Sequence, residues 1–290
     1  MKRPFCFFSL LFCLFVSSTP ESSGAPYPVG VADDKIMATA YQGNEKLRYN
    51  VSWSGGIKIG ELRMEVIKLE GRQERFELRA KVTSTGLFRV FYPVEDTFVT
   101  VVEGAKRLPV TYEVHQKEGR SSDVRRHTEY NQVSGEIRYR KNDRDPVLYQ
   151  VKEEVHNEFS SFFFTRVLQM DPAKPSIVPT FADGKRHEVV VRTGERTRIR
   201  KTVKGDVNVL SVTPIMKFKG LYDKDGDTVI WFTDDICRIP VRVNSKILIG
   251  SLTAELVSYN NPLCLDQSEY HNEIPESVLR KQELEAGDYR

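Results

Sequence analysis

Glu45-Lys46-Leu47-Arg48-Tyr49-Asn50-Val51-Ser52-Trp53-Ser54 places apolar side chains at the odd positions from Leu47 to Trp53 and polar side chains between them. Only an extended strand has a side-chain period of two, so this stretch predicts a β-strand with one buried face. Similar short runs recur between Tyr41 and Pro262, separated by turns that contain Gly, Asn or Asp. The predicted fold is therefore mainly β, an antiparallel meander that forms a barrel or half barrel.

Two glycines interrupt this strand pattern. Beside Gly60 the apolar phase slips by one residue, which is typical of a β-bulge. Thr193-Gly194 predicts a tight turn between a strand at Glu188–Val191 and another at Thr197–Val203.

One segment has a helical period instead of a strand period. The apolar residues at helical spacing are Phe159, Phe162, Phe163, Val167 and Met170. Asn157 or Ser160 could cap the start of this helix, and Asp171-Pro172 would end it. The pattern predicts one helix packed on the curved sheet or plugging it.

The N-terminus has the layout of a secretory signal peptide. Lys2 and Arg3 precede an apolar run from Phe5 to Val16, which is too short to cross a bilayer as a helix. Small residues follow it, and we expect cleavage between Ser18 and Ala25. This predicts an exported protein of the periplasm, cell envelope or extracellular space with no transmembrane segment after cleavage, although an uncleaved anchor remains an alternative.

The domain organisation follows from these patterns. Residues 1–25 are the predicted signal peptide and 26–40 a flexible leader. Residues 41–262 are predicted as a single β-rich domain, since no linker or low-complexity tract divides them. Residues 263–290 are predicted as a polar C-terminal tail.

The charge pattern argues against nucleic acid as a partner. Lys and Arg number 43 against 40 Asp and Glu, and the two signs are mixed along the chain. Binding to phosphate backbones needs a concentrated basic face. The basic stretch from Arg192 to Lys204 alternates with Thr and Ile, which is typical of the solvated face of a strand pair.

Two cysteines, Cys237 and Cys264, remain once residues 1–25 are removed. An oxidising compartment would allow them to form a disulfide. A final hairpin turning near Ser245–Ile249 is expected to pair Cys237 with a residue well before Cys264. We therefore favour two free or buried thiols over a bridge, unless the tail folds back.

The familiar sequence motifs of catalysis and metal binding are absent from the chain. The chain contains no HExxH, CxxC or GxSxG motif and no phosphate-binding glycine loop. Asp223-Lys224-Asp225-Gly226-Asp227 imitates the start of a calcium loop, but a plain Asp-Gly hairpin turn explains it better. We predict no catalytic residue, metal ligand or cofactor, and hence no enzyme; a hydrolase whose carboxylates or Ser-His pair meet only in the folded chain is a third option.

The two ends of the β-rich region resemble a known family. The residues that carry the resemblance are Glu45–Trp53 with Ile57–Glu61, and Trp231–Asp235 with Arg238–Val241 and Ile249–Leu252. They are similar to the bacterial envelope family called domain of unknown function 3108, over roughly Tyr41 to Tyr259. The resemblance implies an exported protein with a β-rich domain, and it implies no activity, cofactor or catalytic residue.

The aromatic residues give the leading functional hypothesis. The chain has 16 Phe, 12 Tyr and 2 Trp, and a curved sheet could present some of them to an apolar or amphiphilic envelope component, lipid-like in character, or to a glycan. We name Tyr49, Trp53 and Trp231 as candidate ligand-binding residues, with core filling as their alternative role. The rival hypothesis is an envelope assembly protein that docks on a partner, not identified by the sequence, through a sheet edge or the tail at 263–290.

Overall fold

The computed structural model describes residues 27–54, 56–71, 74–182, 184–215, 228–246 and 250–264. The predicted signal peptide with its cleavage region, the Asp223–Asp227 turn and the tail beyond residue 264 lie outside them.

The first half of the described chain contains α1 (Asp34–Ala40), β1 (Glu45–Trp53), β2 (Ile57–Lys68), β3 (Arg75–Ser84), α2 (Gly86–Phe91), β4 (Val94–Glu103), β5 (Leu108–Glu118), β6 (Ser122–Asn131), β7 (Glu136–Lys141) and β8 (Val147–Gln150). The second half contains β9 (His156–Asn157), α3 (Glu158–Val167), β10 (Ser176–Ala182), β11 (Lys185–Thr202), β12 (Gly205–Ile215), β13 (Thr228–Thr233), β14 (Pro240–Lys246), β15 (Ser251–Asn260) and a short 3-10 turn (Pro262–Cys264).

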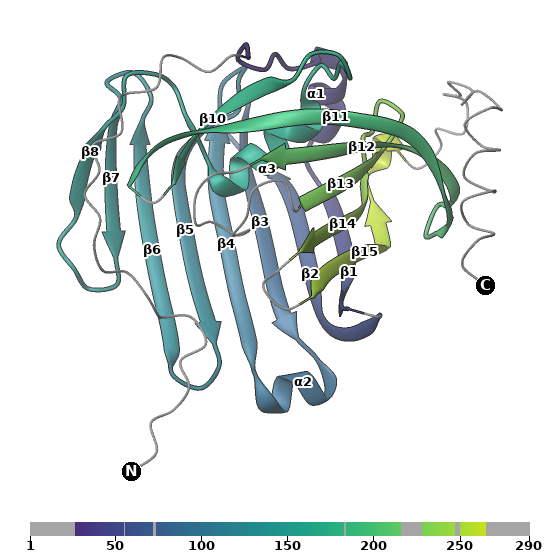
Figure 1. Ribbon diagram of the computed structural model, residues 1–290. Coiled ribbons are helices and arrows are strands. Elements are labelled where there is room, and N and C mark those ends of the chain that lie inside the picture. The colour runs from purple at the N-terminus through teal and green to yellow at the C-terminus, as the bar shows by residue number, and fades with distance from the viewer. Residues whose placement is uncertain are drawn as a thin grey trace, which may run out of the picture.

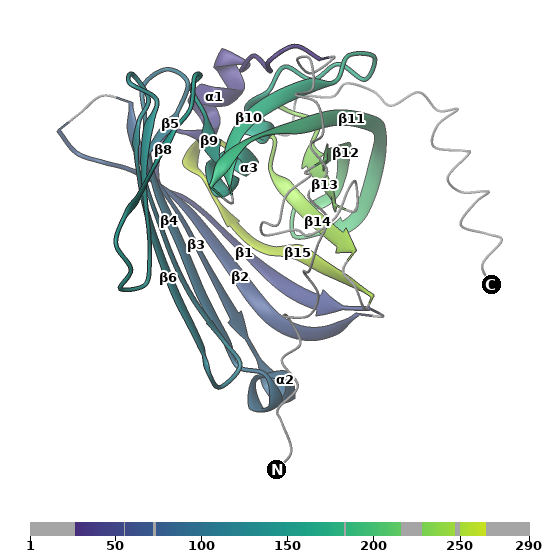
Figure 2. The same ribbon diagram turned by 60° about the vertical axis from the view of Figure 1, so that its left-hand side comes forward.

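All of these strands belong to one sheet, in the order β8-β7-β6-β5-β4-β3-β2-β1-β15-β14-β13-β12-β11-β10-β9. Neighbouring strands are antiparallel, except β9 and β10, which are parallel. The first strand β1 pairs with both β2 and the last strand β15, so the two ends of the β-rich region meet in the middle of the sheet. The long strands of the first half form a tall wall, and β10–β15 curl back beside it (Figures 1 and 2).

The sheet curves strongly but does not close into a barrel. Its two ends approach each other through side chains: the ring of Tyr149 on β8 lies 5.3 Å from the ring of Phe181 on β10. The predicted antiparallel meander forming a half barrel is therefore confirmed. At the seam between the two ends of the sheet, aromatic side chains are in contact but the strands share no backbone hydrogen bonds.

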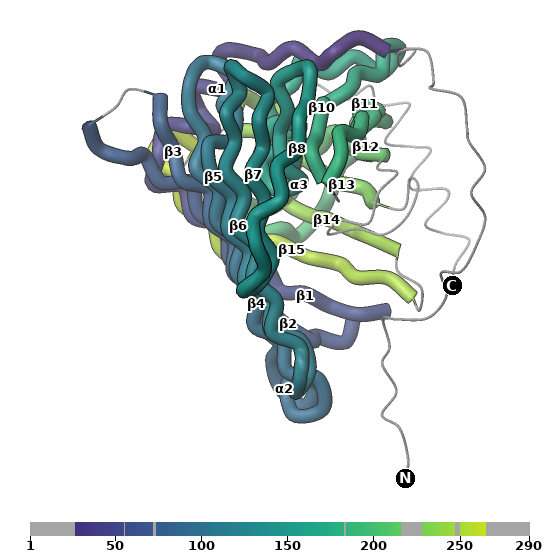
Figure 3. The backbone as a smooth tube through the Cα atoms, turned by 90° about the vertical axis from the view of Figure 1, so that its left-hand side faces the viewer, coloured from purple at the N-terminus to yellow at the C-terminus, as the bar shows by residue number. Residues whose placement is uncertain are grey.

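The predicted helix is confirmed as α3, which lies between the strands of the two halves (Figure 3). The Asn157 side chain accepts hydrogen bonds from the backbone N–H groups of Phe159 and Ser160, and Ser160 completes a capping box. Phe159 and Phe163 are buried in the core. The helix ends at Val167, before Met170, because the next residues turn extended and pair with the chain near Ala32.

The predicted bulge beside Gly60 is also confirmed. Val51 of β1 pairs with Gly60, while the next residue Ser52 pairs with Lys58, so Ile59 is the extra residue. A Cβ atom at position 60 would lie 2.6 Å from the Thr83 carbonyl oxygen, so this close approach of two strands requires glycine.

The turn predicted at Thr193-Gly194 is wrong. β11 runs without a break from Lys185 to Thr202, and its register against β12 shifts between Thr193 and Arg196. The glycine thus marks a bulge in a long, bent strand, since a bulge and a turn both attract glycine. The strong bend of β11 is visible in Figure 2.

Part of the expected flexible leader is ordered. Residues 34–40 form α1, whose N-cap Asp33 accepts hydrogen bonds from two backbone N–H groups. Ile36 and Met37 are buried in the main core. Burial of these apolar side chains in the core accounts for the order of the segment.

Candidate functional site

The three predicted aromatic residues do not converge on one site. Tyr49 is fully buried, and its hydroxyl donates a 2.8 Å hydrogen bond to the Pro240 carbonyl, so the structure places it in the core. Trp231 is half-buried on β13 and alternates with the buried Ile230 and Phe232, so its side chain points to the opposite face of the sheet. Trp53 lies at the end of β1 and is 37% exposed.

Trp53 belongs to an exposed apolar surface that the sequence did not reveal. We call this surface the apolar rim; its members are Trp53, Ile57, Leu87, Val90, Phe91 and Tyr92. They occupy the ends of two neighbouring hairpins, β1–β2 and β3–β4. The backbone N–H of Thr85 donates to the Ile59 carbonyl at 2.8 Å and so ties the start of α2 to β2.

Helix α2 forms the most prominent part of this rim. None of its residues is buried, and Leu87 and Phe91 are each 78% exposed. Phe88 packs on Tyr92 with ring centroids 6.1 Å apart, a contact that stabilises the helix locally. Leu87 and Phe91 take no part in this ring contact and remain exposed to solvent. It stands at the far tip of the long strands, away from the curled half (Figures 1 and 2). Contiguous exposed apolar residues of this kind mark interaction sites.

A buried carboxylate lies on the strand that follows this tip. Asp96 of β4 is only 6% exposed and accepts a 3.0 Å hydrogen bond from the backbone N–H of Lys117. Burial, with a smaller contribution from the charge of Glu118, raises the pKa of Asp96 to about 6. At pH values between the ordinary pKa of 3.8 and about 6, the Asp96 carboxyl of the folded protein therefore keeps a proton that the unfolded chain has already lost.

We therefore expect Asp96 to make the protein less stable as pH rises from about 4 to about 6. Asp96→Asn removes this charge while its amide oxygen can still accept from Lys117. The free energy of unfolding of the variant should exceed that of the wild type by about 1–2 kcal/mol at neutral pH and should match it at about pH 4. Urea unfolding at both pH values measures this; the same pH slope in both proteins would contradict it.

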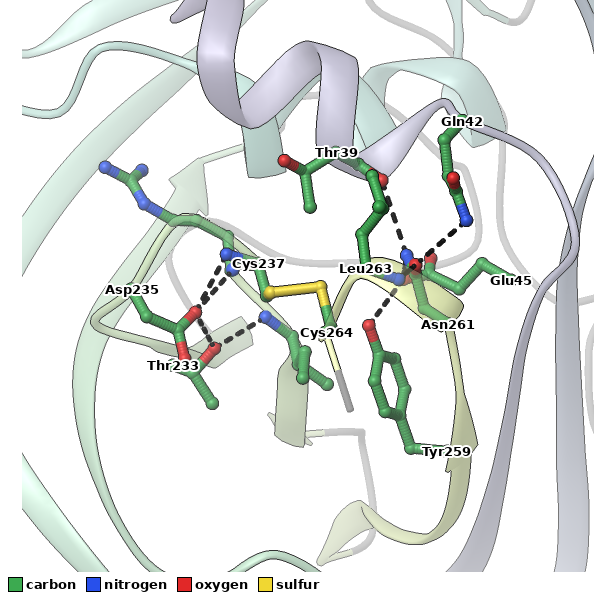
Figure 4. The surroundings of a disulfide bond; sticks show 12 residues. Thr39, Gln42, Glu45, Thr233, Asp235, Cys237, Tyr259, Asn261, Leu263 and Cys264 are labelled. Atoms are coloured by element: carbon green, nitrogen blue, oxygen red, sulfur yellow. Dashed lines mark hydrogen bonds between the residues drawn. A yellow bond between two sulfur atoms is a disulfide. The ribbon is translucent and has the colours of Figure 1, made fainter. Parts of the chain in front are cut away.

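A buried ion pair joins α3, β1 and the end of β15. Arg166 of α3 and Glu45 of β1 form two hydrogen bonds of 2.5 and 2.8 Å, and both side chains are at most 1% exposed. Tyr259 and Asn261 donate to the same Glu45 oxygen at 3.0 and 3.1 Å (Figure 4). Burial lowers the pKa of Arg166, but the Glu45 carboxylate outweighs it and the net pKa is raised. The arrangement keeps the Arg166 guanidinium charged in the core and is structural.

The expectation of free thiols is wrong: Cys237 and Cys264 form a disulfide with their Cα atoms 6.0 Å apart (Figure 4). Arg242 pairs with Glu255, so β15 runs back beside the turn that precedes Pro240. The 3-10 turn at Pro262–Cys264 then folds Cys264 onto Cys237, which is the fold-back of the tail that the sequence left open. The bridge also anchors the Cys237 carbonyl, which accepts from Arg166 at 2.6 Å.

One Ser-His pair does meet in the folded chain. His156 Nδ1 lies 3.3 Å from Ser160 Oγ, but the two residues are 3% and 0% exposed. Burial lowers the pKa of His156 to about 3, and Ser160 Oγ is already engaged in capping α3. A substrate has no access to this pair, so it gives no support to the hydrolase option.

Other site types are weakly represented in the described residues. Within them no three His, Cys, Asp or Glu side chains gather as metal ligands would. A cleft of about 610 Å³ lies at the seam between β8 and β10–β11, bordered by Tyr149, Phe181 and Arg186. In the part of the chain that the structure describes, no helix is both long and apolar enough to cross a membrane.

Two features of the site had partial signals in the sequence. Glu45 stands in the inward phase of β1, two residues before Leu47, which marks it as a charge pointing into the core. Gly86-Leu87-Phe88-Arg89-Val90-Phe91 is an apolar run at a hairpin end, where a polar turn is usual. Neither of these sequence features indicates what the protein binds.

Comparisons with known proteins agree with this architecture. No curated protein matches the chain significantly. Among solved structures, it is similar to a β-barrel-like protein of domain of unknown function DUF1849 from Brucella abortus, with a TM-score of 0.51 and 11% identity over 74% of this chain and 96% of that chain. At this identity the likeness concerns the fold alone. The family model described as protein of unknown function (DUF3108) matches residues 48–257, which confirms the resemblance, and the chain belongs to this family.

Proposed function

We propose that this protein is an exported, non-catalytic β scaffold that binds an apolar or amphiphilic component of the cell envelope through the apolar rim. The observation that carries the proposal is α2, a helix without a single buried residue that exposes Leu87, Val90 and Phe91. Holding these side chains in water is unfavourable, and a lipid-like partner would remove their surface from water. The apolar character of the rim favours such a partner over a glycan.

Export is supported by two independent features. The first 25 residues have the layout of a signal peptide. The disulfide between Cys237 and Cys264 suits an oxidising compartment such as the bacterial periplasm, because cytosolic thiols are kept reduced.

The interior is a less suitable place for a ligand than the rim. Among the described residues, α3 and the core side chains Tyr49, Phe163 and Phe232 occupy the space between the two halves of the sheet, with at most 1% of each exposed. We therefore place the proposed binding site at the outer end of the hairpins and not within the curved sheet. Of the three predicted ligand-binding residues, Trp53 lies there.

Replacing two exposed apolar residues tests the proposal. Leu87→Ser with Phe91→Ser should lower the partition of the purified exported protein onto phosphatidylcholine vesicles by about tenfold or more, because two large apolar side chains no longer leave water. Co-sedimentation measures bound and free protein. Stability should change little, since both residues are exposed.

The matched control is Val133→Ser, in the turn between β6 and β7, where the valine is fully exposed at the opposite end of the strands. It should leave vesicle binding unchanged. Equal binding by the rim variant and the wild type would overturn the proposal.

A second candidate function, docking of a protein partner, is favoured by one observation. β8 is an edge strand of the sheet and exposes Val147 and Leu148 at 48% and 62%. Leu148→Lys should then abolish an envelope crosslink that the wild type forms. The tail that was the other proposed docking element lies outside the described residues.

A further inference from the structure

The end of the molecule that carries the apolar rim also carries unpaired positive charge. Arg89 of α2 and Arg120 of the β5–β6 turn are exposed, and neither forms an ion pair within the described residues. The nearby lysines Lys58 and Lys81 are instead paired, with Glu61 at 3.0 Å and Glu95 at 2.7 Å. The cations that remain available at this end are thus Arg89, Arg120 and Lys117, an exposed residue of β5 that also forms no ion pair within the described residues.

Arg120 lies next to the rim although it is distant from it in sequence. The backbone N–H of Gly119 donates to the Pro93 carbonyl at 2.8 Å. A Cβ atom on Gly119 would lie 3.4 Å from the Tyr92 ring, so the β5–β6 turn packs directly against the residue that follows α2. Arg89 and Arg120 therefore flank the apolar tip from two different hairpins.

The rim also contains side chains that suit a boundary between water and hydrocarbon. Tyr92 is 39% exposed, and its hydroxyl lies 3.4 Å from a carboxylate oxygen of Glu118. Trp53 is half-exposed at the end of β1. Tyrosine and tryptophan gather at membrane interfaces because one part of each ring system is apolar and another carries a polar group.

We infer that the apolar rim seats on the surface of a bilayer with anionic phospholipid headgroups. Leu87, Val90 and Phe91 enter the acyl region, while Arg89 and Arg120 bind lipid phosphates. The inference rests on the proposed function and adds the chemical class of the component. A projecting tip with flanking guanidinium groups complements a fluid acyl layer beneath phosphates, since arginine pairs with phosphate through two parallel hydrogen bonds.

The test separates the two arginines from the apolar residues. Arg89→Gln with Arg120→Gln should lower affinity for vesicles of equimolar phosphatidylcholine and phosphatidylglycerol by about tenfold or more at low salt, since each basic residue near an anionic surface contributes about fivefold. Affinity for pure phosphatidylcholine vesicles should fall far less, because the choline cation of each headgroup offsets the charge of its phosphate. The difference should vanish at high salt, because salt screens exposed charges.

A matched control removes the same charge elsewhere. Arg138 and Arg140 are exposed on β7, away from the rim, and Arg138→Gln with Arg140→Gln should retain full affinity for anionic vesicles. Trp231→Phe leaves Trp53 as the single tryptophan, and brominated lipid should quench its fluorescence. Circular dichroism checks that each variant is folded.

The outcomes distinguish this inference from the proposed function. If Arg138→Gln/Arg140→Gln lowers affinity for anionic vesicles as much as Arg89→Gln/Arg120→Gln does, net charge is responsible. The inference that the rim binds anionic headgroups is then overturned. If Arg89→Gln/Arg120→Gln binds anionic vesicles like the wild type while Leu87→Ser/Phe91→Ser loses all vesicle binding, the inference fails and the proposed function stands. If the rim variant binds every vesicle normally, both fail.

Discussion

Glu45→Gln is expected to lower the free energy of unfolding by about 3–5 kcal/mol. The substitution keeps the shape of the side chain but leaves the Arg166 guanidinium buried without a counter-charge. Removing one partner of a buried pair costs far more than the pair itself contributes, because the remaining charge cannot return to water. Urea unfolding followed by circular dichroism measures the loss.

The control for Glu45 is an exposed ion pair. Glu255 lies 2.8 Å from Arg242, and both side chains are more than a third exposed, so Glu255→Gln should cost less than about 1 kcal/mol. Glu45→Leu combined with Arg166→Met should recover much of the stability lost in Glu45→Gln, since no unpaired charge remains. A cost for Glu45→Gln no larger than that for Glu255→Gln would contradict the structural role of the pair.

Breaking the disulfide should have an effect of similar size. The bridge closes a segment with a sequence separation of 27 residues, and loop-closure entropy for this length predicts a loss of about 3–4 kcal/mol on reduction or in Cys237→Ala/Cys264→Ala. This loss of stability should exceed that caused by a substitution at an exposed residue. Cys264 also fixes the turn next to Asn261, and Asn261 donates a hydrogen bond to Glu45.

The measurement is urea unfolding of the wild type with and without reductant, alongside the double alanine variant. Reductant should destabilise the wild type and leave the variant unchanged, which separates the bridge from general effects of the reagent. Two titratable thiols in the unfolded, non-reduced protein would show that the bridge does not form.

Much of the fold could be predicted because its causes are local. The alternation in Glu45–Trp53 sets which side chains face inward, the phase slip at Gly60 places a bulge, and Asn157 caps the start of α3. The glycine at 194 shows the limit of such local reasoning. A turn and a bulge need the same backbone freedom, and only pairing with β12 distinguishes them.

The candidate site was less predictable, because exposure depends on what the rest of the chain covers. Trp53 was named from the strand pattern, but the same pattern named Tyr49, which the structure buries. Leu87 and Phe91 look like core residues in sequence. They are exposed because the β3–β4 hairpin extends beyond the curled half of the sheet (Figure 1).

The order of residues thus accounts for the strands, their inward faces and the helix, since a peptide's steric limits and hydrogen bonds act over a few residues. Folding alone brought Cys237 to Cys264 and Glu45 to Arg166, which lies 121 positions further along the chain. It also left α2 uncovered. Such outcomes depend on which distant segments share a core, because burial and charge pairing are set by neighbours in space.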